Sequence, residues 1–188
     1  MIDKNITVVT AFFDIGRGDL PAEFRGRLLP HHQHRSVETY FEFFKNLAKL
    51  KNDMVIYTTK EFEERIRAIR IAEGLGDKTY VMVLPSYLPN GFEDIKQDVE
   101  RIMEDETFWK KVHNPQLIEY WHSDYVMVNM LKAYFVSKAV ENGYVDTDLA
   151  AWIDFGYVRT LENLPKNLIW DYGFETDKIH LFNMRSID

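Results

Sequence analysis

The sequence predicts an α/β protein in which a mainly parallel sheet lies between two layers of helices, and three observations support this. Short runs of β-branched and aromatic residues alternate with longer segments whose apolar residues recur at helical spacing. Glycines follow two of the helical segments, and glycine commonly ends a helix. A chain of 188 residues with 46% hydrophobic content can also bury one sizeable core, so a single domain over residues 1–188 is expected.

The first strand is expected at residues 6–13 (ITVVTAFF), because this run is β-branched, aromatic and too short for a stable isolated helix. Ser36 is a suitable N-cap for an amphipathic helix over about residues 37–49. Residues 54–57 (MVIY) then predict a second strand. A strand, a helix and a strand in this order form a crossover unit, whose two strands run parallel.

The second helix is expected to begin near Thr58, because Thr58 and Glu61 have the spacing of a capping box. Its apolar face continues towards Gly74, where the helix should end. Residues 80–84 (YVMVL) follow as a third strand. The repeated alternation of strand and helix predicts that this strand is also parallel to the first two.

The second half of the chain is less regular. An exposed acidic helix is expected over residues 92–106, followed by an aromatic connector over residues 108–120. One long amphipathic helix should cover about residues 123–140. It leads into a strand over residues 149–157 (LAAWIDFGY), and a last strand is expected at residues 179–183.

The strand over residues 149–157 is the most informative segment, because it is expected to be fully buried and yet contains a carboxylate. Open parallel sheets bind ligands at the carboxyl ends of their strands, so Asp154 is a candidate binding residue. Gly156 would let backbone or ligand approach closely. A buried carboxylate must be paired or metal-bound, and the alternative is that Asp154 caps a turn or pairs with Arg159.

The end of the first strand supplies a second group of candidates. The residues expected at the same edge of the sheet are Thr10, Ala11, Phe12 and Asp14. The glycine-containing loop that follows includes Arg17, whose guanidinium could bind phosphate. A solvated, flexible turn explains this loop equally well, since it lacks the spaced glycines of a nucleotide-binding motif.

Lys132 is a third candidate, because it lies on the helix that leads into the strand containing Asp154. A single lysine on a mostly apolar helix often only extends to water, and that alternative stays open at this point. The cluster of His31, His32 and His34 is better explained as polar surface than as a zinc site, because no nearby residues complete a ligand set.

Composition excludes several classes of function. The chain has no cysteine, so thiolate catalysis and thiolate metal sites are excluded, and any metal must be held by oxygen or imidazole. The net charge of −7 opposes nonspecific binding of nucleic acid. No apolar run approaches the roughly 20 residues that a transmembrane helix needs. The amino terminus has no secretory signal pattern, so a cytoplasmic location is expected.

The sequence resembles the bacterial HtrL/YibB family, which includes WlaTC-like proteins of surface-polysaccharide gene clusters. The resemblance spans nearly the whole chain, and its most specific segments are TAFFDIGR at residues 10–17 and WIDFGY at residues 152–157, with Tyr40-Phe41 and residues 47–52 (LAKLKN) in support. It implies a glycosyltransferase with a GT-A-like, Rossmann-like fold that binds a nucleotide sugar. It also implies that family members continue well past residue 188, so this chain is expected to be truncated at its carboxyl end.

The resemblance also implies roles for individual residues, because Thr10, Ala11, Phe12, Arg17, Lys132 and Asp154 match positions of the nucleotide-sugar site. With Asp14 and Gly156, which follow the same strands, the expected nucleotide-sugar-binding residues are Thr10, Ala11, Phe12, Asp14, Arg17, Lys132, Asp154 and Gly156. Of these, Lys132 would contact the diphosphate, and Asp154 would hold manganese or magnesium as the first acid of a DXD motif. Gly156 stands where such a motif has its second acid, so further ligands would come from the diphosphate, water or a downstream residue.

The expected reaction is transfer of a sugar from a nucleoside diphosphate sugar to a surface-glycan or lipid-linked glycan acceptor, and a location peripheral to the inner membrane would suit such an acceptor. One alternative is a noncatalytic module that binds a nucleotide sugar or a glycan during polysaccharide assembly. Another is a metal-dependent hydrolase of phosphate esters that uses Asp14 and Asp154. The sequence identifies no catalytic base, and it does not indicate whether transfer retains or inverts the anomeric configuration.

Overall fold

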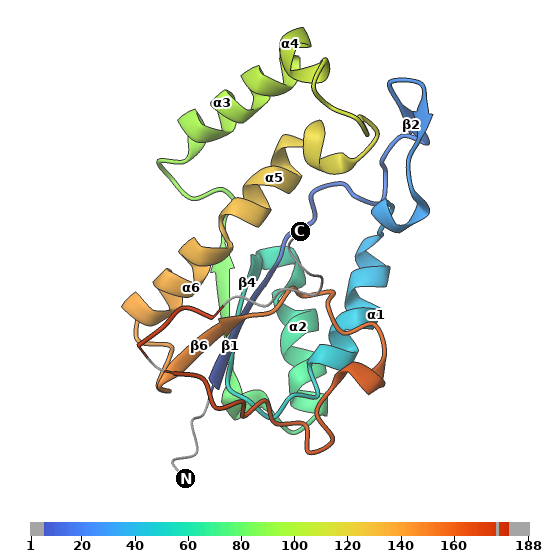
Figure 1. Cartoon of the computed structure of the whole chain (residues 1–188). Helices are drawn as coiled ribbons and strands as arrows, with labels where there is room; N and C mark the ends of the chain where they lie inside the picture. Colours follow the sequence, from blue (N-terminus) through green and yellow to red (C-terminus); the bar gives the residue numbers. More distant parts are fainter. Residues whose placement is uncertain (1–5, 176, 181–188) are drawn as a thin grey trace.

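The computed structural model describes residues 6–175 and 177–180, and its centre is a four-stranded sheet (Figure 1). The strand order is β5-β4-β1-β6, and every pair of neighbouring strands is parallel. The four strands are β1 (Ile6–Phe12), β4 (Met54–Thr59), β5 (Thr79–Leu84) and β6 (Leu149–Trp152). The predicted α/β class with a mainly parallel sheet is therefore confirmed.

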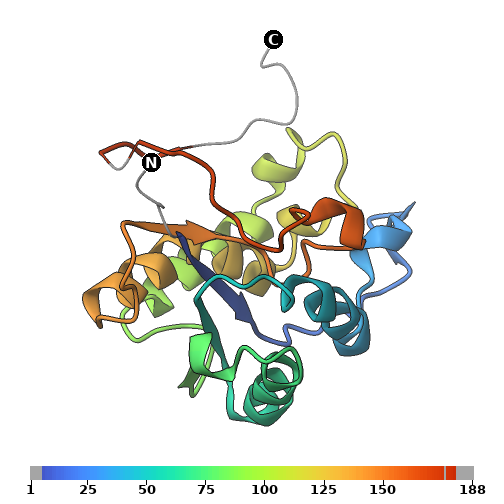
Figure 2. The same cartoon turned by 90° about the horizontal axis from the view of Figure 1, so that it is seen from below.

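Helices cover both faces of this sheet and make three layers (Figure 2). On one face lie α1 (Val37–Leu47) and α2 (Lys60–Ala72), and on the other lies α6 (Lys132–Glu141). The sheet has one hydrophobic core on each face. Successive side chains of β1 pack alternately in these two cores, because side chains alternate between the two faces along a strand. Val8 packs in the core beneath α1, and Val9 packs in the core beneath α6.

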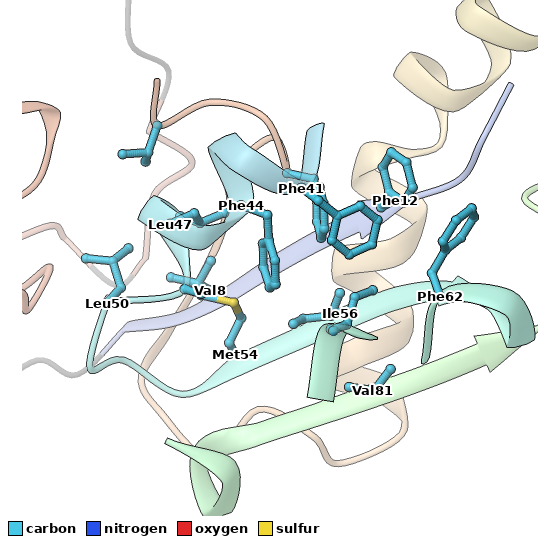
Figure 3. Packing of buried hydrophobic residues seen from close by; sticks show 14 residues of the cluster. Val8, Phe12, Phe41, Phe44, Leu47, Leu50, Met54, Ile56, Phe62 and Val81 are labelled. Carbon is cyan, nitrogen blue, oxygen red and sulfur yellow. The ribbon is translucent and has the colours of Figure 1, made fainter. Parts of the chain in front are cut away.

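Helix α1 begins as predicted, because the Ser36 hydroxyl accepts a hydrogen bond from the Thr39 N–H at 3.2 Å. Its apolar face buries Phe41 and Phe44 completely in the core shown in Figure 3. The Phe12 ring lies 5.3 Å from the Phe41 ring in an edge-to-face arrangement, which aromatic pairs favour. These contacts fix the end of β1 against α1.

The predicted start of the second helix is wrong. Strand β4 continues to Thr59, which pairs with Leu84 of β5, and α2 begins one residue later. The Thr58 hydroxyl donates to the Phe12 carbonyl oxygen at 2.9 Å and caps no helix. Strand pairing with β1 and β5 therefore outweighs the local capping pattern, while Gly74 does follow α2 as expected.

The connection from β5 to β6 contains most of the remaining helices. The exposed acidic helix is confirmed as α3 (Glu93–Glu104), which has no buried residue. The predicted single helix over 123–140 is two consecutive helices, α5 (Ser123–Met130) and α6, with a turn at Leu131 between them. The other short elements are α4 (Glu106–Trp109) and the 3₁₀ helices η1 (His31–Gln33), η2 (Gly76–Lys78), η3 (Ile118–Tyr120) and η4 (Leu161–Asn163).

A small antiparallel hairpin, β2 (Glu23–Phe24) with β3 (Arg27–Leu28), was not predicted. The Phe24 ring is stacked on Trp121 at 4.8 Å and lies 5.6 Å from the Trp109 ring. The Arg25 guanidinium lies over the Trp109 ring at 4.1 Å. The long loop between β1 and α1 is therefore attached to the segment around α4 and η3 by aromatic contacts.

Strand β6 differs from its prediction in length and burial. It ends at Trp152, and each of its residues is only partly buried, because it pairs with β1 on one side and forms a sheet edge within the described ranges. Of the predicted last strand, residues 179 and 180 are not in a strand, and residues 181–183 lie outside the described residues. No helix within 6–175 or 177–180 is long and apolar enough to cross a bilayer.

Candidate functional site

A cleft lies where the strand order of the sheet reverses. From β1 the chain adds β4 and β5 on one side and later β6 on the other, so the switch point is between β1 and β6. Open α/β sheets bind ligands outside the carboxyl ends of the strands at such a point. A cavity of about 110 Å³ occupies this place and is lined by residues that follow both strands. We call it the switch-point cleft.

Seven of the eight predicted site residues line the switch-point cleft. They are Ala11, Phe12, Asp14, Arg17, Lys132, Asp154 and Gly156. The eighth, Thr10, is completely buried within the sheet, where it pairs with Ile56 of β4, and it does not line the cleft. Its hydroxyl has no hydrogen-bond partner in the described structure. The geometry thus brings the other seven together, and their binding roles stay predictions.

Arg17 is held firmly but keeps part of its hydrogen-bonding capacity. Its Nε and one terminal nitrogen both donate to the Gln33 carbonyl oxygen, at 3.2 and 2.8 Å, and the other terminal nitrogen donates to the Tyr40 hydroxyl at 2.5 Å. Its guanidinium also lies over the Tyr125 ring at 5.1 Å. A guanidinium carries five N–H donors, so two have no protein partner among the described residues. Arg17 is therefore a candidate for binding an anion in the cleft.

The turn before Arg17 has a specific backbone geometry. One Asp14 carboxylate oxygen accepts a hydrogen bond from the Gly16 N–H at 3.0 Å, which is an Asx turn. Gly16 has a φ of 76°, in the left-handed region that favours glycine. The turn directs Arg17 back towards Gln33 and Tyr40. Of the four loop residues 16–19, three are exposed, as in a solvated turn, whereas Arg17 is buried and makes the contacts described above.

Lys132 and Asp154 form an ion pair on the cleft wall. The Lys132 Nζ lies 2.7 Å from Asp154 Oδ1, and the Trp152 indole N–H donates to the same oxygen at 2.7 Å. Asp154 therefore pairs with Lys132, and no hydrogen bond or ion pair joins it to Arg159 in the described structure. The alternative that Lys132 only extends to water is also excluded, because its ammonium group makes this ion pair. The second carboxylate oxygen of Asp154 has no partner among the described residues.

Gly156, where the family resemblance would place a second acid, has no space for a larger side chain. A Cβ atom at this position would lie 2.9 Å from a ring carbon of Tyr40, which is closer than real contacts allow. An aspartate would displace Tyr40, the residue whose hydroxyl accepts from Arg17. The space that a second carboxylate would need is therefore already filled.

The residues present fit a divalent cation only together with phosphate. No three side chains of the His, Asp and Glu types lie close enough to hold a metal in the part of the chain that the structure describes. Asp154 offers one free oxygen, and magnesium sites in proteins often use one carboxylate with substrate phosphates and waters. A cation at Asp154 would therefore depend on a diphosphate and on water for its other ligands.

A second, larger cavity adjoins the first. Its volume is about 820 Å³, and Lys132, Trp152 and Asp154 line both cavities. The aromatic rings on its walls belong to Trp152, Tyr157, Trp170, Tyr172 and Phe174. We call it the aromatic cavity. The ion pair therefore lies at the boundary between the two cavities.

Sequence reasoning did not predict several lining residues of the switch-point cleft. Among them are Tyr40, Tyr125 and Asn129, none of which was proposed as a site residue. Burial raises the pKa of Tyr125. The side-chain amide of Asn129 donates to the Tyr125 carbonyl oxygen at 2.8 Å, and its carboxamide oxygen has no hydrogen-bond partner among the described residues. No local signal separates these residues from ordinary helix positions, because their place in the cleft depends on how α1 and α5 pack near the end of β1.

His122 was also missed. Its Nδ1 accepts from the Tyr125 N–H at 3.3 Å at the start of α5, and its ring also hydrogen-bonds the backbone of Ile15. Burial lowers the pKa of His122. The residue therefore ties the loop after β1 to α5. In the histidine cluster, by contrast, the side chains of His31 and His32 are exposed, as polar surface would be.

Comparison with known proteins places this chain in a family. A protein-family model described as a bacterial protein of unknown function (HtrL_YibB) matches residues 4–187. The chain belongs to the HtrL/YibB family. It is 43% identical to Protein HtrL of Escherichia coli (strain K12), and the match covers 97% of this chain and 61% of that protein. The chain thus spans about three fifths of the length of this curated relative. No solved structure matches it.

Proposed function

We propose that this HtrL/YibB protein is a glycosyltransferase that moves a sugar from a nucleoside diphosphate sugar to a surface-glycan or lipid-linked glycan acceptor. The observation that carries the proposal is that Arg17, Lys132 and Asp154 line one cleft at the switch point of a parallel sheet. Two cations beside a carboxylate suit a ligand that is anionic and also carries hydroxyl groups. The assignment of the sheet to the GT-A type is part of the same proposal.

Arg17 and Lys132 would hold the diphosphate. When the bond between the sugar and the diphosphate breaks, negative charge grows on the departing phosphate oxygens. Arg17 has two free donors for these oxygens, and Lys132 has two more beyond its contact with Asp154. Because Gln33 and Tyr40 fix the guanidinium in advance, little reorganisation accompanies the reaction.

Asp154 would hold manganese or magnesium through its free carboxylate oxygen. A bound cation would act as a Lewis acid towards the phosphate oxygens. The contacts of Trp152 and Lys132 with the other oxygen orient the carboxylate towards the cleft. Ala11, Phe12 and Gly156 would form the wall next to the bound nucleotide sugar. The proposed location is the cytoplasm, at the periphery of the inner membrane, where a lipid-linked acceptor can be reached.

A binding module without catalysis is a second candidate, and the ion pair favours it specifically. Lys132 already offsets the charge of Asp154, so the cleft can accept an anionic ligand without a metal ion. Both candidates predict binding of a sugar nucleotide. Only the transferase predicts release of the nucleoside diphosphate when an acceptor is present.

Calorimetric titration of the full chain with UDP-glucose and GDP-mannose, with manganese or with EDTA, tests the proposal. We expect at least one sugar nucleotide to bind, and Asp154→Ala to weaken its binding in manganese by about tenfold or more. Asp148→Ala is the matched control, because this exposed acid lies just before the other end of the same strand. The proposal fails if no nucleotide binds under any condition, or if both variants have the same effect.

A further inference from the structure

We propose that the aromatic cavity binds a pyranose ring beside the Lys132–Asp154 pair. This inference rests on the proposed function and deepens it, because it assigns the sugar and the phosphate groups to different cavities. The switch-point cleft, at about 110 Å³, is far smaller than the roughly 300–1,000 Å³ of most ligand sites. The adjoining aromatic cavity, at about 820 Å³, has ample volume for a sugar ring.

The aromatic rings of this cavity suit a sugar. A pyranose ring has C–H groups on its faces and hydroxyl groups around its rim. The C–H groups carry partial positive charge and pack against the electron-rich face of an aromatic ring. The Tyr157 and Tyr172 side chains lie on the wall and are 55% and 62% exposed. Large apolar rings that remain this exposed around a cavity are available to a ligand.

Trp152 connects the two parts of the site. Its indole N–H donates to Asp154 Oδ1 at 2.7 Å, and its ring is stacked with Phe135 at 6.3 Å. These two contacts fix the orientation of the indole. Trp152 lines both cavities, so a ligand that extends from one to the other must pass this ring.

The ion pair argues against a purely hydrocarbon occupant. A lipid chain or an apolar peptide in this cavity would remove water from Lys132 and Asp154 and give no hydrogen bonds in return. Sugar hydroxyl groups can donate to the free Asp154 oxygen and accept from the Lys132 ammonium. Asn163, on the same wall, can do both. The sugar could belong to the nucleotide donor or to the acceptor, and both sources have this chemistry.

Saturation-transfer NMR on the full chain tests the inference with three kinds of probe: UDP, UDP-glucose with UDP-galactose, and the methyl glucopyranosides and galactopyranosides. We expect transfer to the sugar ring protons of at least one probe. The double variant Tyr157→Ala/Tyr172→Ala should weaken sugar binding by about 3–10-fold, the effect of losing one aromatic contact, and should leave UDP binding unchanged. Tyr80→Ala is the matched control, because Tyr80 is 45% exposed on the opposite edge strand.

The outcomes separate the inference from the proposed function. Sugar-ring signals that depend on the two tyrosines, from sugar nucleotides or from free glycosides, support the inference and identify the source of the sugar. If UDP binds but no sugar ring gives a signal, or if the double variant behaves like Tyr80→Ala, the inference is overturned while the nucleotide site stands. If the glycosides bind in the tyrosine-dependent manner and no nucleotide binds, the transferase proposal fails while the sugar site stands.

Discussion

Arg70 and Arg17 lie at opposite ends of the same sheet, and their guanidinium groups differ in how many hydrogen bonds they donate. Arg70, at the amino end, is completely buried and donates all five N–H groups, to four carbonyl oxygens and the Thr79 hydroxyl. Arg17, at the carboxyl end, is also buried but donates only three. Every N–H group of the Arg70 guanidinium is therefore used within the fold. The Arg17 guanidinium has two N–H groups without a partner among the described residues, which a ligand could accept from.

Asn52 shows the same pattern at the amino end. Its side-chain amide donates to the Ile6 and Trp170 carbonyl oxygens at 2.9 and 3.0 Å, and its oxygen accepts from the Trp170 N–H at 2.8 Å. At the carboxyl end, Asp154 and Lys132 satisfy only part of each other's capacity. Among these side chains, the ones with unused hydrogen-bonding groups in the described structure lie at the end of the sheet where ligands of α/β proteins bind.

Arg70→Met should give the largest effect on stability. It leaves buried carbonyl oxygens without donors, so we expect the free energy of unfolding to fall by more than about 3 kcal/mol. Arg17→Met should cost clearly less, because fewer contacts are lost and the side chain faces a cleft that water can enter. Urea denaturation of both variants measures the difference. Equal losses of unfolding free energy in the two variants would contradict the distinction between the amino and carboxyl ends of the sheet.

Gly156→Ala should have the next largest effect. The new methyl group would displace the Tyr40 ring, and overpacking of this kind costs about 1–3 kcal/mol. It should also disturb Arg17, whose guanidinium donates to the Tyr40 hydroxyl. Gly173→Ala is the matched control, since a Cβ there meets nothing within 4 Å. Thermal unfolding compares the two variants, and an unaffected Gly156→Ala would argue against the contact with Tyr40.

His122 should make the stability of the protein sensitive to acid. Burial lowers its pKa from the ordinary 6.5, and the positive charge of Arg17 acts in the same direction, while Asp124 opposes both. The unfolded chain therefore binds this proton more readily than the folded chain. The contribution of His122 is complete above pH 6.5 and is lost as the pH falls below 6.5 towards the folded pKa.

His122→Ala should remove this acid sensitivity. It should also cost about 1 kcal/mol at pH 8 through loss of the cap of α5. Denaturation curves between pH 8 and pH 5 measure both effects. His113→Ala is the control, because His113 is exposed and its side chain makes no hydrogen bond in the described structure. A pH profile that His122→Ala leaves unchanged would assign the acid sensitivity to other groups.

Lys132→Gln should have the smallest effect on stability. The two side chains of its ion pair are 31% and 54% exposed, and exposed pairs contribute less than about 1 kcal/mol. Binding of UDP should nevertheless weaken, because Lys132 would contact the diphosphate. Lys110→Gln, an exposed lysine outside both cavities, should change neither quantity. A loss of stability without a loss of affinity would assign Lys132 to the fold and not to a ligand.

The sequence predicted features that depend on local pattern and strand order. The parallel sheet, the Ser36 cap and the gathering of Lys132 and Asp154 at one edge follow from hydrophobic period and from the geometry of crossover units. Features set by long-range packing were not predicted. Thr58 bonds to β1 because β4 extends past it, and the hairpin at β2 forms because distant aromatic rings hold it.

The same reason explains the cleft residues that were missed. Tyr40 comes from α1 and Tyr125 from α5, two helices far apart in the sequence, and their packing around Arg17 brings them together. Thr10 was placed in the site because it lies near the strand end, but a completely buried position keeps it behind the cleft wall. The sequence position of a residue predicted that it lies near the carboxyl edge of the sheet, but it did not predict whether its side chain is exposed in the cleft.

The position of β1 in the sheet also determines the order in which the chain can fold. β1 precedes the other three strands of this sheet in the chain, yet it pairs with β4 at Met54 on one side and with β6 only at Leu149 on the other. Loops that join such distant partners close slowly, because their entropy is lost before the new contacts form. On the ribosome, the three-stranded part can assemble early. The cleft, however, can form only after the segment that contains Asp154 has left the exit tunnel.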